Sequence, residues 1–412
     1  MYLKSVVVLV ILSIWATCNG DHQGDELQLS GAIRLNQVGY LPDQHKVAIV
    51  LTEESLDQFS VWDMEGNKLV FEGAACRQDV KTFSGKTAWR LDFSAVVEEG
   101  RFEINVKNFG KSYPFFIRKE VYTDLSKASL KAFYFQRAST DLPAEFAGKW
   151  ARKAGHPDTQ VEIHPSAASE GRPAGTVISS PKGWYDAGDY NKYMVNSGIT
   201  MATLLSLYEG YPDFFANQKL AIPESENSLP DILDEALWNL DWMLTMQDPN
   251  DGGVYHKLTT VKFEGMMEPE KAVNQRYLVR KSTAATLDFA AVMAQAARIY
   301  KVFSPEDAVM YQKAAEMAWD WAVLHPEEYY RQENLNRDFD PDVTTGAYGD
   351  QNLSDEWIWA ASELYISTHN LDYWDILESA DLEYRIPSWS QVKWLGLYSL
   401  IRHEDALPQI PE

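Results

Sequence analysis

"SLPDILDEALWNLDWMLTMQ" (residues 228–247) has the residue spacing of an amphipathic α-helix. Its apolar side chains recur every three or four positions and form one stripe, which comprises Ile232, Leu233, Ala236, Leu237, Leu240, Met243 and Leu244. Ser228 is placed to cap the helix, Pro230 suits its first turn, and Asp231 favours the positive end of the helix dipole. The stretch therefore predicts a helix that buries one face.

The same periodicity recurs along the chain after residue 121. Further helices are expected at 123–139, 197–209, 281–303, 305–324, 354–368, 371–378 and 389–402. Long connections rich in Gly, Pro and aromatic residues separate them, and loops of such length inside a compact domain are usually functional. Because no strand pattern of comparable strength follows residue 121, we expect an all-α domain over 122–412 whose chemistry is carried on its loops.

Residues 31–118 show a different pattern. Short apolar runs with partial period-two alternation lie between turn signals such as EGN and EEG; they are KVAIVLT, FSVWDM, KLVFEG, AWRLDF, RFEINVK and YPFFIRK. No helix-length pattern intervenes, so these runs predict a β-sandwich. A chain of 412 residues is also too long for one core at about 150 residues per domain. The fold class expected is therefore multidomain, a β-sandwich followed by a helical domain.

The charge of the chain excludes some partners. The formal net charge is −23, from 60 acidic and 37 basic residues. Such a chain repels phosphate backbones and anionic lipid, so we expect no nucleic-acid partner and no electrostatic attraction to membranes. Aromatic residues make up 13% of the chain, which suits a neutral ligand with flat apolar faces such as a sugar.

The N-terminus has the pattern of an export signal. Lys4 precedes the apolar run "SVVVLVILSIWA" (5–16), and a polar segment follows. A run of this length is too short for a membrane span and fits a signal peptide, which we place at residues 1–20. Cys18 lies where the acylated cysteine of a bacterial lipoprotein would lie, although Trp15 and Thr17 depart from the usual preferences. We expect an exported chain that is periplasmic, extracellular or a cell-surface lipoprotein, with a lipid anchor as its one route to a membrane.

Two closely spaced aspartates stand in "GWYDAGDYNKY" (183–193). Only Ala187 and Gly188 separate Asp186 from Asp189, and aromatic residues flank the pair. Neighbouring carboxylates can grip one water molecule, with one orienting it and the other removing its proton, as in the base half of an inverting glycosidase. The spacing alone leaves open a cation site, or an Asx-turn with packed aromatic rings.

The wider sequence resembles glycoside hydrolase family 9, the cellulase family that contains many endoglucanases. The resemblance is carried by SPKGWYDAGDYNKYMVNSG (180–198), NSLPDILDEALWNLDWMLTMQDPNDGGVYHKLTT (227–260), STAATLDFAAVMAQAARIY (282–300) and GAYGDQNLSDEWIWAASELY (346–365). RLNQVGYLP (34–42) is similar to the first strand of the Ig-like module that precedes some of these catalytic domains. The resemblance thus implies an Ig-like sandwich over 31–118 and an (α/α)6 toroid beyond it.

Site residues follow from the resemblance position by position. Asp189 matches the catalytic base, and Asp186 matches the residue that helps to hold the nucleophilic water. Trp184 and Tyr185 lie beside the base and are candidate sugar contacts, with packing in the core as the alternative. His256 matches a segment that lines the sugar subsites, with a structural histidine as its alternative.

We expect no metal site in this chain. Some family members hold zinc with cysteines near the loop that carries His156 and His164, but those cysteines are absent here. A structural calcium ion stays open, because aspartates are plentiful, yet no EF-hand spacing supports a particular site. No cofactor is required for the expected reaction. Asp355 and Glu356 follow Ser354, so we interpret them as first-turn acidic residues of a helix rather than as catalytic groups.

The chain departs from the family pattern toward its C-terminal end. We count about eight helices where the toroid needs twelve, and neither the histidine- and arginine-bearing motif nor the glutamate that serves as general acid is found. The expectation is a toroid lacking its C-terminal third and a chain that folds poorly and has negligible glucanase activity alone. Measurable hydrolysis of soluble β-glucan by the 412-residue chain would contradict it.

The expected function is hydrolysis of β-1,4-glucosidic bonds in cellulose or a related β-glucan, with inversion and endo action. Two alternatives stay open. One is a non-catalytic surface protein that binds glycan without cutting it. The other is an exo-acting glucosidase or a xyloglucanase on the same fold.

Overall fold

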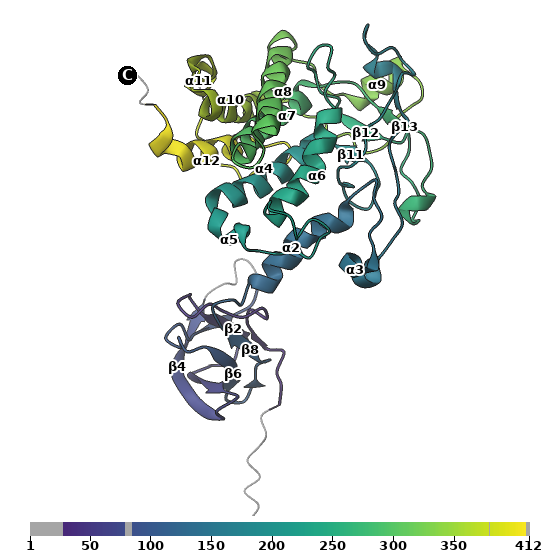
Figure 1. Ribbon diagram of the computed structural model, residues 1–412. Coiled ribbons are helices and arrows are strands. Elements are labelled where there is room, and N and C mark those ends of the chain that lie inside the picture. The colour runs from purple at the N-terminus through teal and green to yellow at the C-terminus, as the bar shows by residue number, and fades with distance from the viewer. Residues whose placement is uncertain (1–27, 79–84, 379, 409–412) are drawn as a thin grey trace, which may run out of the picture. The chain divides into compact units, whose positions relative to one another are not determined.

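The computed structural model describes residues 28–78, 85–378 and 380–408. The chain divides into two compact units, Met1–Leu125 and Ser126–Glu412, which we describe separately (Figure 1). The expected signal peptide and Cys18 lie outside the described residues. Within the described ranges, no helix is both long enough and apolar enough to cross a membrane.

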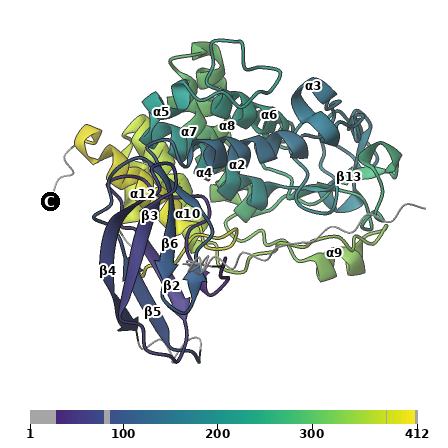
Figure 2. The same ribbon diagram turned by 90° about the horizontal axis from the view of Figure 1, so that it is seen from below.

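The first unit is an antiparallel β-sandwich. Its described strands are β1 (Ile33–Arg34), β2 (Val47–Leu51), β3 (Gln58–Asp63), β4 (Lys68–Gln78), β5 (Ala88–Asp92), β6 (Gly100–Val106), β7 (Gly110–Lys111) and β8 (Phe115–Ile117). They follow the order β1-β2-β5-β4-β3-β6-β7, and β8 also pairs with β6. The long strand β4 pairs with β3 along one part and with β5 along another, which joins the two halves of the sandwich (Figure 2).

Alternation along these strands builds the core of the first unit. In β2 and β6 every second side chain is buried, because successive side chains of a strand point to opposite faces. Val50, Val61, Leu91 and Ile104 are fully buried in one cluster. All six predicted strands are confirmed, whereas β1 and β7, of two residues each, are too short to show a period.

The second unit is mainly helical. Its described helices are α2 (Thr123–Gln136), α3 (Ala144–Ala147), α4 (Met194–Gly210), α5 (Pro212–Ala216), α6 (Asp231–Thr245), α7 (Thr283–Tyr300), α8 (Pro305–Leu324), α9 (Gln332–Asp338), α10 (Ser354–Thr368), α11 (Leu371–Leu377) and α12 (Lys393–His403). Helix α7 is buried along almost its whole length and packs against α4, α8 and α10 (Figure 1).

The number of helices corrects the sequence-based expectation. The described residues form eleven α-helices, not about eight. The three additional helices are α3, α5 and α9, which have four to seven residues. Such helices complete at most two turns, so no apolar stripe can develop in their sequence. The helical character of the unit is confirmed, and the six-hairpin toroid stays a prediction.

A small sheet lies among the helices, and the expectation of an all-α unit missed it. Its strands are β9 (Val161–Ile163), β10 (Val177–Ile178), β11 (Lys192–Tyr193), β12 (Lys257–Thr259) and β13 (Arg276–Leu278), in the order β10-β9-β13-β12-β11. Each strand has two or three residues, so period two could not be recognised. Strands β9, β10 and β11 come from the long connection before α4, and β12 and β13 come from the connection between α6 and α7.

The quoted stretch forms α6 as predicted, but not with the predicted cap. Helix α6 begins at Asp231, and its N-cap is Pro230, which makes no side-chain hydrogen bond. Ser228 lies three residues before the first helical residue, too far to reach the free N–H groups of the first turn, so the capping role expected for it is wrong. The apolar stripe is buried as expected, with Leu237 and Leu244 half-buried.

Substitution of Gly252 tests how the connection after α6 packs on α8. Gly252 has φ +86°, and a Cβ atom there would lie 2.4 Å from the carbonyl oxygen of Met317. We expect Gly252→Ala to lower the free energy of unfolding by about 2–3 kcal/mol, because it adds backbone strain and a clash. Urea denaturation followed by tryptophan fluorescence measures the change.

Gly265→Ala is the matched control, since a Cβ atom there would meet only Met267 Cε, at 3.7 Å. We expect it to change the free energy of unfolding by less than about 1 kcal/mol. Equal destabilisation by the two substitutions would show that close packing at Gly252 does not matter.

Candidate active site

Asp186 and Asp189 lie on a turn that is exposed at its tip. Ala187 and Gly188 between them are exposed, while both aspartates are half-buried. The turn closes through a hydrogen bond from Asp186 N to Asn191 O of 3.1 Å. It therefore presents two carboxylates toward solvent from a closed loop.

The segment that leads into this turn is anchored on the helices. Tyr185 N donates to Gln136 O at 2.9 Å, and Ala138 N donates to Gly183 O at the same distance. Gly183 has φ +77°, and a Cβ atom there would lie 2.8 Å from the ring of Trp242. Only glycine fits this position without strain, so the approach to Asp186 follows a fixed path along α6.

Asp189 is held through one of its carboxylate oxygens. Oδ2 accepts hydrogen bonds from Asn191 Nδ2 at 2.8 Å and from Tyr193 OH at 2.9 Å. Burial and the Asp189 charge raise the pKa of Tyr193, which keeps its hydroxyl protonated as a donor. Among the described residues no side chain or backbone N–H donates to Oδ1, so this oxygen is available to a water molecule.

Asp186 is held through both oxygens. Oδ1 accepts from Asn196 Nδ2 at 2.7 Å, and Oδ2 accepts from Tyr348 OH at 2.9 Å. Burial raises the pKa of Asp186, these two hydrogen bonds lower it in part, and the charge of Asp189 raises it again. Its geometry suits a group that orients a water molecule, while Asp189 keeps an oxygen free to take a proton.

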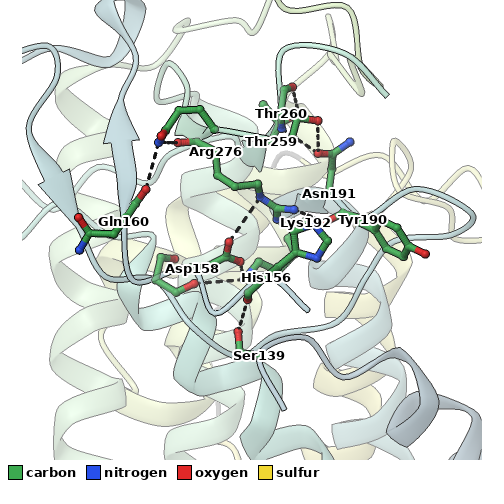
Figure 3. Close-up of polar contacts among 12 residues, drawn as sticks. Ser139, His156, Asp158, Gln160, Tyr190, Asn191, Lys192, Thr259, Thr260 and Arg276 are labelled. Atoms are coloured by element: carbon green, nitrogen blue, oxygen red, sulfur yellow. Dashed lines mark hydrogen bonds and ion pairs between the residues drawn. The ribbon is translucent and has the colours of Figure 1, made fainter. Parts of the chain in front are cut away.

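A buried charge network supports the far side of the turn (Figure 3). Lys192 Nζ lies 2.8 Å from Asp158 Oδ2, and Arg276 Nε lies 3.5 Å from Asp158 Oδ1. Arg276 Nη1 also donates to the carbonyl oxygen of Tyr190 at 2.7 Å, directly after Asp189. Burial lowers the pKa of Lys192 to about 8, and Asp158 opposes this shift. The network thus holds the backbone that follows the aspartates.

Asn191 links Asp189 to the small sheet. Its Oδ1 accepts from Thr260 N at 2.9 Å (Figure 3), while its Nδ2 donates to Asp189 Oδ2 at 2.8 Å. Asn191 is buried, so the orientation of its amide is set by these partners. The position of the Asp189 carboxylate therefore depends on the strand end at Thr260.

Trp184 and Tyr185 are both buried, yet both line a cavity of about 100 Å³ that reaches Asp186. Trp184 Nε1 donates to Glu235 Oε1 at 2.8 Å, and Tyr185 OH pairs with His156 Nδ1 at 2.9 Å. The polar atoms of both side chains thus form hydrogen bonds within the protein. The structure favours packing for most of each ring and leaves a small surface beside Asp186.

His256 lies inside the protein and not in a cleft. It is fully buried, its ring stacks on Tyr330 with centroids 3.9 Å apart, and its two nitrogens meet Ser282 Oγ and Ala347 O at 2.9 Å. The structure favours the structural role that the sequence left open for this histidine. His256 lies directly before β12, an interior strand of the small sheet.

His156 and His164 belong to separate environments. His156 pairs with Tyr185, whereas His164 Nε2 donates to Pro341 O at 2.9 Å. Within the described ranges, no group of three or more His, Cys, Asp or Glu side chains is placed to share a metal ion. The acidic residues Asp248 and Asp251 both bind Lys281 Nζ, at 2.7 and 2.8 Å.

Asp355 and Glu356 lie in the first turn of α10, as expected, but both are buried. Asp355 Oδ2 accepts from Val392 N at 2.7 Å. Burial, together with Asp288 nearby, raises the pKa of Glu356 well above its ordinary value. Nothing in the sequence near Ser354 signals this burial, because it depends on α7 and the residues before α12.

Sequence reasoning missed three of the groups that hold the carboxylates: Asn191, Asn196 and Tyr348. Asn196 could have been found, because α4 starts at Met194 and places it near the end of the aspartate turn. Tyr348 carries no such signal, since it lies 162 residues from Asp186 in the chain. Tyr193 is one of the aromatic residues that flank the aspartates, and it serves as a buried donor.

His256 should make stability depend on pH. Burial lowers its pKa to about 3 in the folded chain, against about 6.5 when unfolded. The unfolded state therefore binds one proton more between these values, so His256 contributes its full stability above pH 6.5 and loses it as the pH falls toward 3. We expect His256→Gln to reduce the slope of unfolding free energy against pH by about 1.4 kcal/mol per unit, measured by urea denaturation from pH 7 to 4.

His369→Asn is the control, because His369 is exposed and its left-handed backbone accepts asparagine. It should leave the slope unchanged. An unchanged slope in His256→Gln would mean that His256 is protonated in the folded chain.

Comparison with known families gives two matches. Residues 122–406 match the family model described as glycosyl hydrolase family 9, and residues 28–111 match the model described as the cellulase N-terminal Ig-like domain. The two matches follow one another in the order that the strand and helix patterns predict.

Curated relatives and solved structures agree with these matches. A xyloglucan-specific endo-β-1,4-glucanase of Bacteroides ovatus is 48% identical over 376 residues, which cover 90% of this chain and 63% of the relative. Endoglucanase D of Acetivibrio thermocellus is 32% identical over 390 residues, covering 92% and 59%. A solved Bacteroides ovatus structure titled GH9 has a TM-score of 0.88 at 46% identity, covering 93% of this chain and 70% of that one. The chain thus spans about three fifths of the length of these two curated relatives.

Proposed function

The chain belongs to glycosyl hydrolase family 9, and on that premise we propose that it takes part in hydrolysing β-1,4-glucosidic bonds of a β-glucan with inversion at the anomeric carbon. The premise comes from a family match over residues 122–406 and an identity of 48% to a curated relative. The observation that carries the proposal is the aspartate turn, in which two carboxylates flank an exposed Ala–Gly pair and are held by different donors.

In this mechanism Asp189 is the general base. A water molecule bound between the two carboxylates donates one proton to Asp189 and is oriented by Asp186, then attacks the anomeric carbon. Asn191 and Tyr193 occupy Oδ2 of Asp189, which supports Oδ1 as the proton acceptor. Since Asp186 accepts two hydrogen bonds, it can hold the water without changing position.

We assign the general acid to none of the described residues. Asp355 and Glu356, the carboxylates at the start of α10, are buried, so they are poorly placed to protonate a leaving oxygen. The proposed enzyme therefore contains the base half of an inverting pair within residues 183–193, and its acid half stays unassigned.

The proposed substrate is a soluble β-glucan, and xyloglucan is the first candidate. The support is the printed activity of the Bacteroides ovatus relative, which is xyloglucan-specific. Endoglucanase D supports the broader class. We also propose that the chain is exported, on the pattern of residues 1–20, and that the reaction needs no cofactor.

The base can be tested apart from the acid by using β-cellobiosyl fluoride, because fluoride leaves with little protonation. We expect Asp189→Asn to lower the rate of fluoride release by about 10²–10⁴-fold, the usual contribution of a general base. Asp320→Asn is the control, since Asp320 is exposed on α8, and it should retain the full rate.

The stereochemistry of the product is read by proton NMR in the same reaction. An initial α-anomer indicates inversion. Fluoride release that survives in Asp189→Asn, or an initial β-anomer, would contradict the proposed mechanism. Binding of xyloglucan by a folded chain with no turnover of either substrate would favour a glycan-binding protein.

A further inference from the structure

We propose that Lys257 is a positioning residue that fixes Asp186 and Asp189 together by holding residues 345–348 against both. The mechanism above does not use this lysine. It is fully buried on β12, an uncommon place for an ammonium group unless it is paired. The kinetic test of this inference rests on the proposed function, because it measures hydrolysis. The NMR test does not.

Strand pairing places Lys257 beside Tyr193, one of the residues that hold the carboxylates. In the register of β11 with β12, Lys257 is the cross-strand partner of Tyr193, whose hydroxyl donates to Asp189. The ammonium lies 5.6 Å from the ring centroid of Tyr193 and 5.4 Å from that of Tyr330. Within the described residues it forms no ion pair, so its contacts are neutral oxygens and aromatic faces.

All three N–H donors of Lys257 have partners on a distant part of the chain. Nζ donates to Gly346 O at 2.6 Å, to Gln332 Oε1 at 2.8 Å and to Thr345 Oγ1 at 3.1 Å. An ammonium has three donors and no acceptor, so its capacity is used in full. Lys257 thus binds the segment between α9 and α10 to the sheet.

That segment reaches both aspartates. Gly346 N donates to Tyr193 OH at 3.2 Å, and Tyr193 OH in turn donates to Asp189 Oδ2 at 2.9 Å. Two residues further, Tyr348 OH donates to Asp186 Oδ2 at 2.9 Å. One lysine therefore controls a donor to each carboxylate, and displacing residues 345–348 would loosen both.

The charge of Lys257 acts on Asp189 as well. Asp189 acts electrostatically on Asp186, Tyr193, Tyr348 and Lys257. Lys257 is the cation of this set, so it is attracted to the Asp189 carboxylate. Burial lowers the pKa of Lys257 to about 7, and Asp189 opposes that shift.

The kinetic test compares Lys257→Met with Lys46→Met on β-cellobiosyl fluoride. Lys46 is also fully buried and donates to backbone carbonyls, but it lies in the β-sandwich. We expect Lys257→Met to lower kcat by about 10²-fold, as for a displaced reacting group, with KM nearly unchanged. Lys46→Met should change none of these, even if it lowers stability.

Carbon-13 NMR of labelled aspartate carboxyl groups tests the same inference without hydrolysis. The resonances of the two aspartates are assigned by their loss in Asp186→Asn and Asp189→Asn. In Lys257→Met the carboxyl resonances of both aspartates should shift, because their donors Tyr193 and Tyr348 are displaced. In the wild-type chain the Asp189 resonance should show an inflection near pH 7, where Lys257 loses its proton.

These outcomes separate the two proposals. If the wild type and Asp189→Asn release fluoride equally, the proposed function fails, and the NMR arms still decide the role of Lys257. If Lys257→Met folds and keeps both kcat and the carboxyl resonances of Asp186 and Asp189, the inference is overturned. If Lys257→Met does not fold, the wild-type titration decides, and an Asp189 resonance without an inflection near pH 7 overturns it.

Discussion

The antiparallel pairing of β11 with β12 is the constraint on which the candidate site depends. It consists of two residue pairs, Lys192 with Leu258 and Tyr193 with Lys257. A slip of one residue would turn each side chain to the opposite face, and Tyr193 would no longer reach Asp189. The hydrogen bonds from Met194 N to His256 O and from Thr260 N to Asn191 Oδ1 hold the register at both ends. A very short ladder thus sets the geometry of the turn and the start of α4.

Buried charge surrounds this ladder, in a chain whose net charge is −23. Lys192 is neutralised by Asp158, and Arg137 binds Glu224 and Glu235. Removing one partner of such a buried pair leaves the other charge buried and unpaired, which typically lowers the free energy of unfolding by about 3–5 kcal/mol. These buried ion pairs therefore favour one arrangement of the loops. Lys257 differs from Lys192 and Arg137, because the charged group that acts on it is Asp189.

Sequence patterns predicted most clearly the elements that are long enough to repeat their period more than twice. Helix α6, with 15 residues, shows its apolar stripe over four turns, and β2 and β6 show alternation over five and seven residues. The strands that build the site have two or three residues, too few for any period to appear. The same limit hid helices α3, α5 and α9. The elements that position the carboxylates were therefore the least visible in the sequence.

By itself, the sequence determined a strand-rich unit followed by a helical one, and a pair of aspartates on a loop before a helix. These follow from residues that are close along the chain, where spacing sets geometry. Only the tertiary structure decided which atoms hold the pair. Tyr348 meets Asp186 across 162 positions, and Lys257 meets Thr345 across 88. It also decided that His256 is buried, because burial depends on what packs over a side chain, and a linear pattern does not record that.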